Sequence, residues 1–120
     1  MIKLVMCLRR HPDKSREEFQ DYWLNDHGPF FQKNAATMRA KKYVQSHTVT
    51  TPLSNGFIES RGMLAEYDGV AEVWFESEDE LVEAMSSTEG QRLATALHED
   101  EQTFIDHSTS TAFIVKEHEL

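Results

Sequence analysis

The sequence predicts an α+β fold in which a four-stranded antiparallel sheet is covered by helices on one face. Four short apolar or β-branched segments are separated by helical patterns in the order strand, helix, strand, strand, helices, strand. Capping boxes at Ser15 with Glu18 and at Ser77 with Glu80 mark helix starts after the first and third of these segments. A length of 120 residues without internal repeats fits one domain, so residues 1–120 are interpreted as a single unit.

The first half of the chain is predicted to contain two strands with helical segments between them. IKLVMCLRR, residues 2–10, is a short apolar run that ends at a proline-containing turn. The aromatic spacing predicts a helix over residues 16–27. We expect that helix to end there, because Gly28 can adopt a left-handed cap and Pro29 disfavours continuation before a second helical piece. Residues 39–50 are rich in β-formers and predict a second strand.

The second half begins with residues 51–68, which are rich in Pro, Ser, Asn and Gly. They predict a long loop with room for one helical turn, of the kind that often serves as a lid. A strand at 69–77 leads into a capped helix through ELVEAM, a further helix runs from 88 to about 105, and the last strand covers 108–118. This order is the split βαββαβ arrangement of a ferredoxin-like fold.

The strand DGVAEVWF carries apolar residues on both of its faces. Strand alternation places Ala71, Val73 and Phe75 on one face and Val70 and Trp74 on the other. Because the helices can cover one face only, the second face needs a partner. We therefore expect a homodimer that packs its sheets face to face.

Composition excludes several classes of partner. A net charge of −9, from 21 acidic and 12 basic residues, argues against nucleic-acid and anionic-membrane partners, which require clustered Lys and Arg. No apolar run approaches the roughly 18 residues of a membrane span. The single cysteine, Cys7, lies in an apolar run and is interpreted as a buried structural thiol rather than a nucleophile. A soluble, cytoplasmic protein is expected.

MIKLVMCLRRHPDKSREEFQDYWLNDHGP and YDGVAEVWFESEDEL resemble the EthD family of dimeric α/β-barrel proteins and, more distantly, the muconolactone methylisomerase group. The resemblance covers nearly the whole chain except residues 51–66, where substrate choice is expected to lie. It implies a ferredoxin-like protomer that dimerises through its sheets and holds a small-molecule cavity between sheet and helices. Related barrel families include cofactor-free monooxygenases, polyketide cyclases, lactone isomerases and dehydratases, so the fold alone selects no reaction.

His27, in YWLNDHGPF, allows two interpretations. A histidine in the last turn of a helix interacts favourably with the helix dipole and can cap free carbonyl groups, which is a structural role. The resemblance implies a catalytic role, because methylisomerase-like proteins place a histidine at the corresponding helix end, facing the cavity. We expect the ring to lie at the cavity rim because the helix stops there.

The second strand supplies further candidates. Tyr43, Gln45 and His47 alternate onto one face of the strand, which suggests polar groups lining a cavity, although a solvent-exposed edge strand would show the same pattern. Tyr43 and His47 are roughly 13 Å apart along an extended strand, so they are expected at opposite ends of a site. In the third strand, Glu72 lies among apolar neighbours and is expected to be paired or raised in pKa. Trp74 fits either an interface or a stacking surface.

No metal or cofactor site is legible in the sequence. The histidines outside the two candidate segments show no H-x-H or H-E-x-x-H spacing, and no glycine-rich loop joins a strand to a helix. His98 and the acidic residues that follow it are interpreted as a solvated helix face. We therefore expect neither a bound metal nor an organic cofactor.

These candidates predict a cofactor-free enzyme that binds an apolar, oxygenated organic molecule. His27 and His47 are the predicted acid and base, and Tyr43 polarises the substrate in proton transfer at carbon, as in isomerisation, cyclisation or dehydration. Gln45, Glu72 and Trp74 are the predicted substrate-binding residues. The alternatives are an oxidoreductase or accessory protein of an oxidative degradation system, and a carrier that binds a ligand without turnover.

Overall fold

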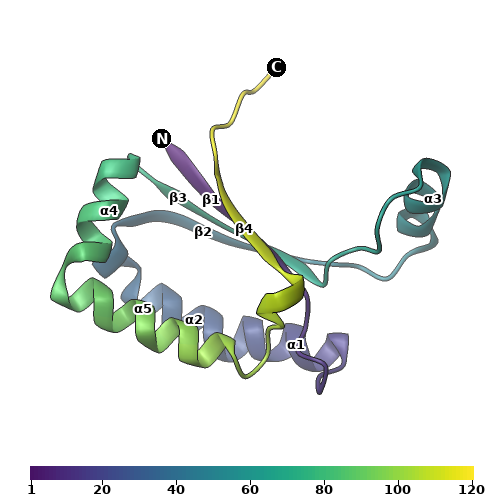
Figure 1. Ribbon diagram of the computed structural model, residues 1–120, viewed down its shortest axis with the longest axis horizontal. Helices are drawn as coiled ribbons and strands as arrows, with labels where there is room; N and C mark the ends of the chain where they lie inside the picture. The colour runs from purple at the N-terminus through teal and green to yellow at the C-terminus, as the bar shows by residue number, and fades with distance from the viewer.

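A four-stranded antiparallel sheet is the centre of the computed structural model, which describes residues 1–120 (Figure 1). The strands are β1 (Ile2–Leu8), β2 (Ala40–His47), β3 (Gly69–Phe75) and β4 (Thr111–Val115), in the spatial order β2-β3-β1-β4. β3 pairs with β1 and β2, and β1 also pairs with β4. The predicted ferredoxin-like α+β fold is confirmed, with each strand shorter than predicted.

Helices cover one face of the sheet and leave the other face open (Figure 1). The helices on this face are α1 (Arg16–Tyr22), α2 (Gly28–Asn34), α4 (Glu78–Ser86) and α5 (Thr88–Glu101). Ser15 and Glu18 make both bonds of the predicted capping box, and the Ser77 side chain accepts from the backbone N–H of Glu80. α5 begins at Thr88, the start predicted for the last helix, and the Ser87 side chain caps it.

The predicted helix end at Gly28 is wrong, because the chain stays helical there. A π-helical segment, η1 (Trp23–His27), joins α1 to α2, and Gly28 has an ordinary right-handed conformation with φ −57°. The N–H of Gly28 donates to the carbonyl of Trp23, five residues earlier. This wider turn accommodates Pro29 in the first turn of α2, where its missing N–H costs little. His27 therefore lies at a π-bulge inside a longer helix.

The predicted loop at 51–68 contains a ten-residue helix, α3 (Pro52–Arg61). The Thr51 side chain caps its start by accepting from the N–H of Leu53, and Gly62 ends it in the left-handed region at φ 63°. None of its residues is buried, and α3 projects away from the sheet and the other helices (Figure 1). The helix formed despite the turn-rich composition because both of its ends are capped locally.

The core lies between the sheet and the helices that cover it. Ala71, Val73 and Phe75 of β3 are at most 5% exposed and face the helices, which confirms the predicted face assignment. Phe19 and Phe104 are fully buried in the cluster that contains Ala71, whereas Val73 and Phe75 belong to a second cluster with Met38 and Leu93. No helix has both the length and the apolar character needed to cross a bilayer.

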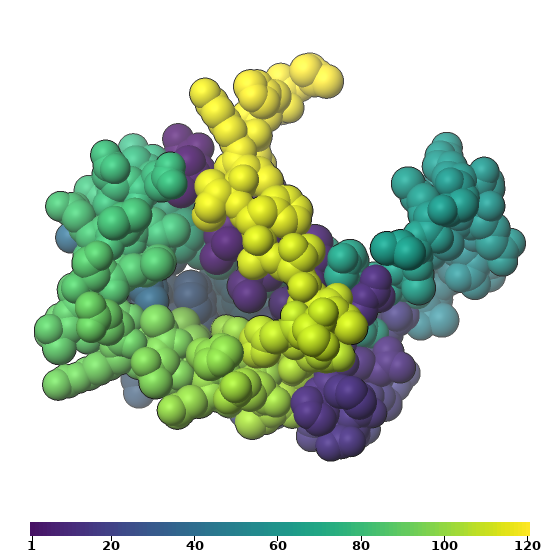
Figure 2. All heavy atoms as spheres, viewed as in Figure 1, coloured from purple at the N-terminus to yellow at the C-terminus, as the bar shows by residue number.

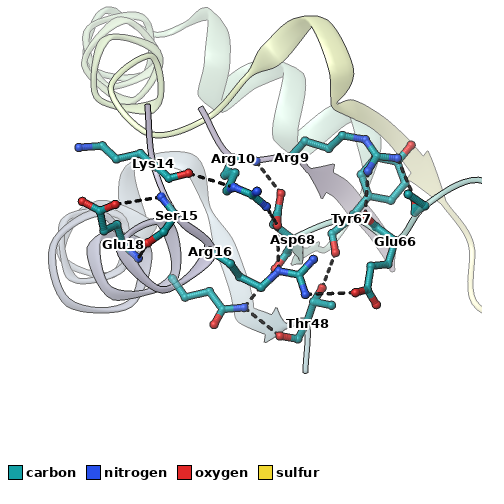
Figure 3. A network of polar contacts seen from close by, with 12 residues as sticks. Arg9, Arg10, Lys14, Ser15, Arg16, Glu18, Thr48, Glu66, Tyr67 and Asp68 are labelled. Carbon is teal, nitrogen blue, oxygen red and sulfur yellow. Dashed lines mark hydrogen bonds and ion pairs between the residues drawn. The ribbon is translucent and has the colours of Figure 1, made fainter. Parts of the chain in front are cut away.

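A polar network joins the end of β1 to the segment that precedes β3 (Figure 3). The carboxylate of Asp68, which is 4% exposed, accepts from the backbone N–H and the guanidinium of Arg10 and from Nε of Arg16, at 2.8–3.0 Å. Arg16 also pairs with Glu66 at 3.1 Å. Burial alone would raise the pKa of Asp68, but the hydrogen bonds from the two arginines outweigh it and lower that pKa.

Candidate functional site

An apolar cavity of about 290 Å³ lies between the sheet and the helical layer. Figure 2 shows the hollow between α4 and α5, in green, and β4, in yellow, with purple β1 visible inside it. Its walls come from β1, β2, β3, η1, α2, α4 and α5. Its few polar side chains, set among otherwise apolar ones, are His27, Tyr43, His98 and Glu101. A cavity of this size and character suits a small, mainly apolar organic molecule.

His27 lies in the cavity wall and is held by a carboxylate from α5. Its Nδ1 is 2.6 Å from Oδ2 of Asp100, while the other carboxylate oxygen accepts a hydrogen bond from the Tyr22 hydroxyl. The His27 side chain is 8% exposed, and the centroid of its ring lies 5.1 Å from that of the Phe104 ring. The π-helical turn places Trp23 and His27 together on the buried side of the helix. The His27 ring is thus held by the Asp100 carboxylate at Nδ1 and by packing beside the Phe104 ring.

This pairing determines which nitrogen of His27 is free. An ionised carboxylate only accepts hydrogen bonds, so Nδ1 carries the proton that it donates to Asp100. Nε2 has no hydrogen-bond partner within the protein. Every side-chain nitrogen or oxygen that is shut off from solvent has a partner, so Nε2 is not one of these buried atoms. Nε2 is therefore open to the cavity with its lone pair available, which is the form of histidine that accepts a proton.

Asp100 is a candidate site residue that the sequence did not suggest, because it lies in the acidic run that was interpreted as a solvated helix face. The helical spacing contained a signal for it. Leu93, Leu97 and Phe104 form the apolar stripe of the last helix, and Asp100 falls between Leu97 and Phe104 on that stripe. A carboxylate on a buried stripe needs a partner, and His27 and Tyr22 are its partners.

Tyr43, Gln45 and His47 are linked by hydrogen bonds on the helix-covered face of β2. The Gln45 amide donates to the Tyr43 hydroxyl oxygen and to the Trp23 carbonyl, each at 2.8 Å. Its carbonyl oxygen lies 2.8 Å from Nε2 of His47, which donates to it. The predicted common face is confirmed, and Gln45 bridges two residues that were expected to lie apart. Tyr43 alone of the three reaches the cavity.

Burial determines the protonation states of Tyr43 and His47. It raises the pKa of Tyr43, against the opposing hydrogen bonds of Gln45 and Trp23, so the phenol keeps its proton at neutral pH. Burial also lowers the pKa of His47, whose ring stacks on Trp23 at 4.7 Å, so His47 is neutral there. Because the Tyr43 oxygen already accepts from Gln45, its own proton is free to be donated to a ligand.

Two glycines allow the helix to approach the sheet closely at this point. A Cβ on Gly28 would lie 2.7 Å from Nε2 of Gln45, and one on Gly69 would lie 2.5 Å from the Trp23 ring. A side chain at Gly69 would press against the buried Trp23 ring, whereas one at Gly28 would displace the Gln45 amide from its hydrogen bonds to Tyr43 and Trp23. Gly28 therefore leaves room for the Gln45 amide and does not form the left-handed cap that the sequence suggested.

Glu72 and Trp74 lie on the open face of the sheet and do not line the cavity. Glu72 forms an ion pair with Lys3 at 2.5 Å, as the paired interpretation expected. The Trp74 indole donates to Glu117 at 2.5 Å and lies beneath the Lys3 and Lys42 ammonium groups. The structure thus places these two candidates on the other side of the sheet from His27 and Tyr43.

Comparisons with known proteins bear on this fold. The EthD domain model matches residues 11–108. An EthD family protein from Bacillus halodurans is similar with a TM-score of 0.65 and 20% identity, over 98% of this chain and 99% of that one. A dimeric protein of unknown function with a ferredoxin-like fold from Bacteroides fragilis gives 0.62 and 9%, over 97% and 95%. SnoaB, a cofactor-independent oxygenase from Streptomyces nogalater, gives 0.56 and 13%, over 99% and 94%. No curated protein matches the chain.

The three solved structures share the fold, and at these identities they carry no substrate assignment. The family match is more specific. It runs from the turn after β1 to the short η3 turn (His107–Thr109) and includes His27, Asp100 and the three polar residues of β2. Since the match spans most of the chain, the chain belongs to the EthD domain family.

Proposed function

We propose that this protein binds an apolar, oxygenated organic molecule in the cavity and transfers a proton at carbon without a cofactor. The observation that carries the proposal is the His27–Asp100 pair in the wall of an otherwise apolar cavity. Such chemistry needs a base with a free lone pair, a carboxylate that orients it and few competing polar groups.

The proposed reaction begins with a C–H bond next to a carbonyl group. Nε2 of His27 takes the proton, and the electron pair of that C–H bond moves onto the carbonyl oxygen to form an enolate. Asp100 stabilises the imidazolium that results, while the Tyr43 hydroxyl donates to the enolate oxygen. The enolate electrons then re-form the carbonyl group. In an isomerisation, the enolate is conjugated with a double bond and its γ carbon takes the proton from the imidazolium. In a dehydration, the C–O bond at the β carbon breaks, and the imidazolium gives its proton to the departing hydroxyl group, which leaves as water.

His47 and Gln45 act in this proposal as positioning residues rather than as the predicted acid and binding group. His47 does not line the cavity, and its Nε2 proton is committed to Gln45. Gln45 in turn holds the Tyr43 oxygen and anchors it to the π-helical segment through the Trp23 carbonyl. Their contribution is to orient the Tyr43 hydroxyl that meets the ligand.

Deuterium exchange at carbon tests the proposal across the whole class of candidate substrates. The protein is incubated in D2O with a panel of aromatic ketones, unsaturated lactones and β-dicarbonyl compounds, and incorporation at carbon is followed by mass spectrometry. We expect enzyme-dependent exchange in at least one compound that also raises the melting temperature. Binding to every such compound without exchange would favour the carrier alternative.

The second candidate is oxidation by molecular oxygen. SnoaB, which is described as a cofactor-independent oxygenase, has a similar fold, and an enolate formed in an apolar cavity is also a species that can react with oxygen. The same incubations under argon and under air separate the two. Products that form only in air would contradict the isomerase proposal and support the oxygenase alternative.

We also propose that the protein is a homodimer that packs through the open sheet faces. That face presents Val5, Val70 and the 47% exposed Phe113, and the similar Bacteroides fragilis protein is described as dimeric. α3 supports the same conclusion, because a ten-residue helix that buries none of its residues is marginal by itself and gains packing from a second copy.

Light scattering is expected to give twice the 13.9 kDa chain mass at micromolar concentration. Phe113→Lys is expected to shift the protein to monomer, because the dimer would bury an unpaired ammonium group. Val82→Lys on α4, at a site 53% exposed, is the matched control and should stay dimeric. A monomeric wild-type protein, or equal behaviour of the two variants, would contradict this interface.

A further inference from the structure

A second group of polar side chains lies where the cavity meets solvent. His98 and Glu101, three residues apart, share one face of the last turns of α5, and both line the cavity. The chain then reverses, and η3 brings His107 back beside them, with the His98 and His107 rings 5.2 Å apart. His98 and His107 form no metal-binding motif in the sequence, but the chain reversal makes them neighbours in space.

The backbone that carries His107 is well anchored. Ile105 is 3% exposed and bridges to Arg10, and the N–H of Asp106 donates to the Arg9 carbonyl at 2.9 Å. The Asp106 side chain accepts from the N–H of Ser108 and so caps η3. His107 is therefore held near α5 by contacts that do not involve its own ring.

The three donor atoms are close enough to share one ion. All lie within 4.8 Å of one another, and Nε2 of His107 is 3.0 Å from Oε1 of Glu101. Ligand atoms bound at about 2.1 Å in a tetrahedral site are about 3.4 Å apart, so modest side-chain rotations close the remaining gap. Both histidine rings are exposed, so they can rotate. Rotation of His98 would break only its 3.3 Å contact with Gln102.

We propose that His98, Glu101 and His107 bind a divalent transition-metal ion of the Zn²⁺ class at the entrance of the cavity. Two imidazoles and one carboxylate are a frequent donor set for metals that keep a coordination position open. Since two of the three ligands line the cavity, the open position faces the space where a ligand oxygen would enter. The site is separate from the His27–Asp100 pair and does not depend on the proposed proton transfer.

Calorimetric titration of untagged, chelator-treated protein with ZnCl2 tests this site without any substrate. We expect one Zn²⁺ per chain for the wild type. His107→Gln and His98→Gln should each weaken binding by at least about 100-fold, because even the loss of an outer partner of a metal ligand costs 10–100-fold. His118→Gln, at an exposed histidine near the chain end, is the matched control and should bind as the wild type does.

Two results would overturn the proposal. The first is no binding by the wild type at about 100 μM Zn²⁺, a concentration well above the dissociation constants of protein zinc sites. The second is equal binding by the wild type and both variants. Substitution of Co²⁺ supplies a spectroscopic check. A visible band that appears with the wild type and with His118→Gln, and that is absent from His107→Gln, would support direct histidine coordination. Circular dichroism of each variant confirms that it is folded.

Discussion

Replacement of His27 by glutamine is expected to lower the rate of enzyme-catalysed deuterium exchange by at least about 100-fold, the scale typical of losing a general acid–base group. The physical reason is that Nε2 of His27 is the free basic nitrogen in the cavity wall, whereas an amide has no comparable basicity. Ligand affinity should change little, since the apolar walls remain. The measurement is the exchange rate by mass spectrometry, with affinity from a thermal shift.

The fold should survive this substitution. Glutamine can still donate to Asp100, so the expected loss of unfolding free energy is about 1 kcal/mol. His118→Gln is the control and should exchange at the wild-type rate. Asp100→Asn tests the orienting carboxylate, and we expect a smaller kcat with KM nearly unchanged and an altered pH profile. Unchanged exchange in His27→Gln would return His27 to a purely structural role.

Replacement of Asp68 by asparagine is expected to lower the unfolding free energy at pH 7 by about 2–3 kcal/mol, or roughly 10 °C in Tm. Asp68 is 4% exposed and accepts from Arg10 and Arg16, so the neutral amide leaves two guanidinium groups without their shared carboxylate (Figure 3). The expected loss lies below the roughly 3–5 kcal/mol of a fully buried pair, because Arg10 is 43% exposed and Arg16 keeps Glu66.

The effect should depend on pH in a defined direction. The pKa of Asp68 is lower in the folded state than its ordinary value of 3.8, so its contribution is present above pH 3.8 and is lost as the pH falls through the folded pKa. Urea denaturation of both proteins at pH 7 and at pH 3 measures this. The difference between them should shrink at pH 3, and Asp13→Asn, at a side chain 86% exposed, should match the wild type at both. A constant difference at both pH values would contradict the ion-pair explanation.

Local patterns in the sequence were sufficient wherever the physics is local. The capping boxes at Ser15 and Ser77 started helices as predicted, because a cap depends on residues three positions apart. Strand alternation assigned Tyr43, Gln45 and His47 to one face, and it placed Phe75 in the core, because the side-chain period of a strand is independent of its neighbours. The family resemblance was confirmed by a domain match over residues 11–108, which also includes residues 51–66.

Other features needed the tertiary structure. Gly28-Pro29 indicates a helix end locally, yet a π-helical turn keeps the chain helical, and Gly28 lies against the Gln45 amide of β2. Composition alone could not predict α3, whose capped ends outweigh its turn-forming residues.

By itself, the sequence determined the order of the elements, the two faces of the sheet and the candidacy of His27 and Tyr43. Only the tertiary structure decided which partners these side chains meet. Asp100 is 73 residues from His27 and becomes its partner because α5 packs beside the π-helical segment. Chain reversal brings His107 to His98 in the same way. Hydrogen bonds and metal sites depend on distances of a few ångströms, and between separate elements those distances are set by packing rather than by sequence spacing.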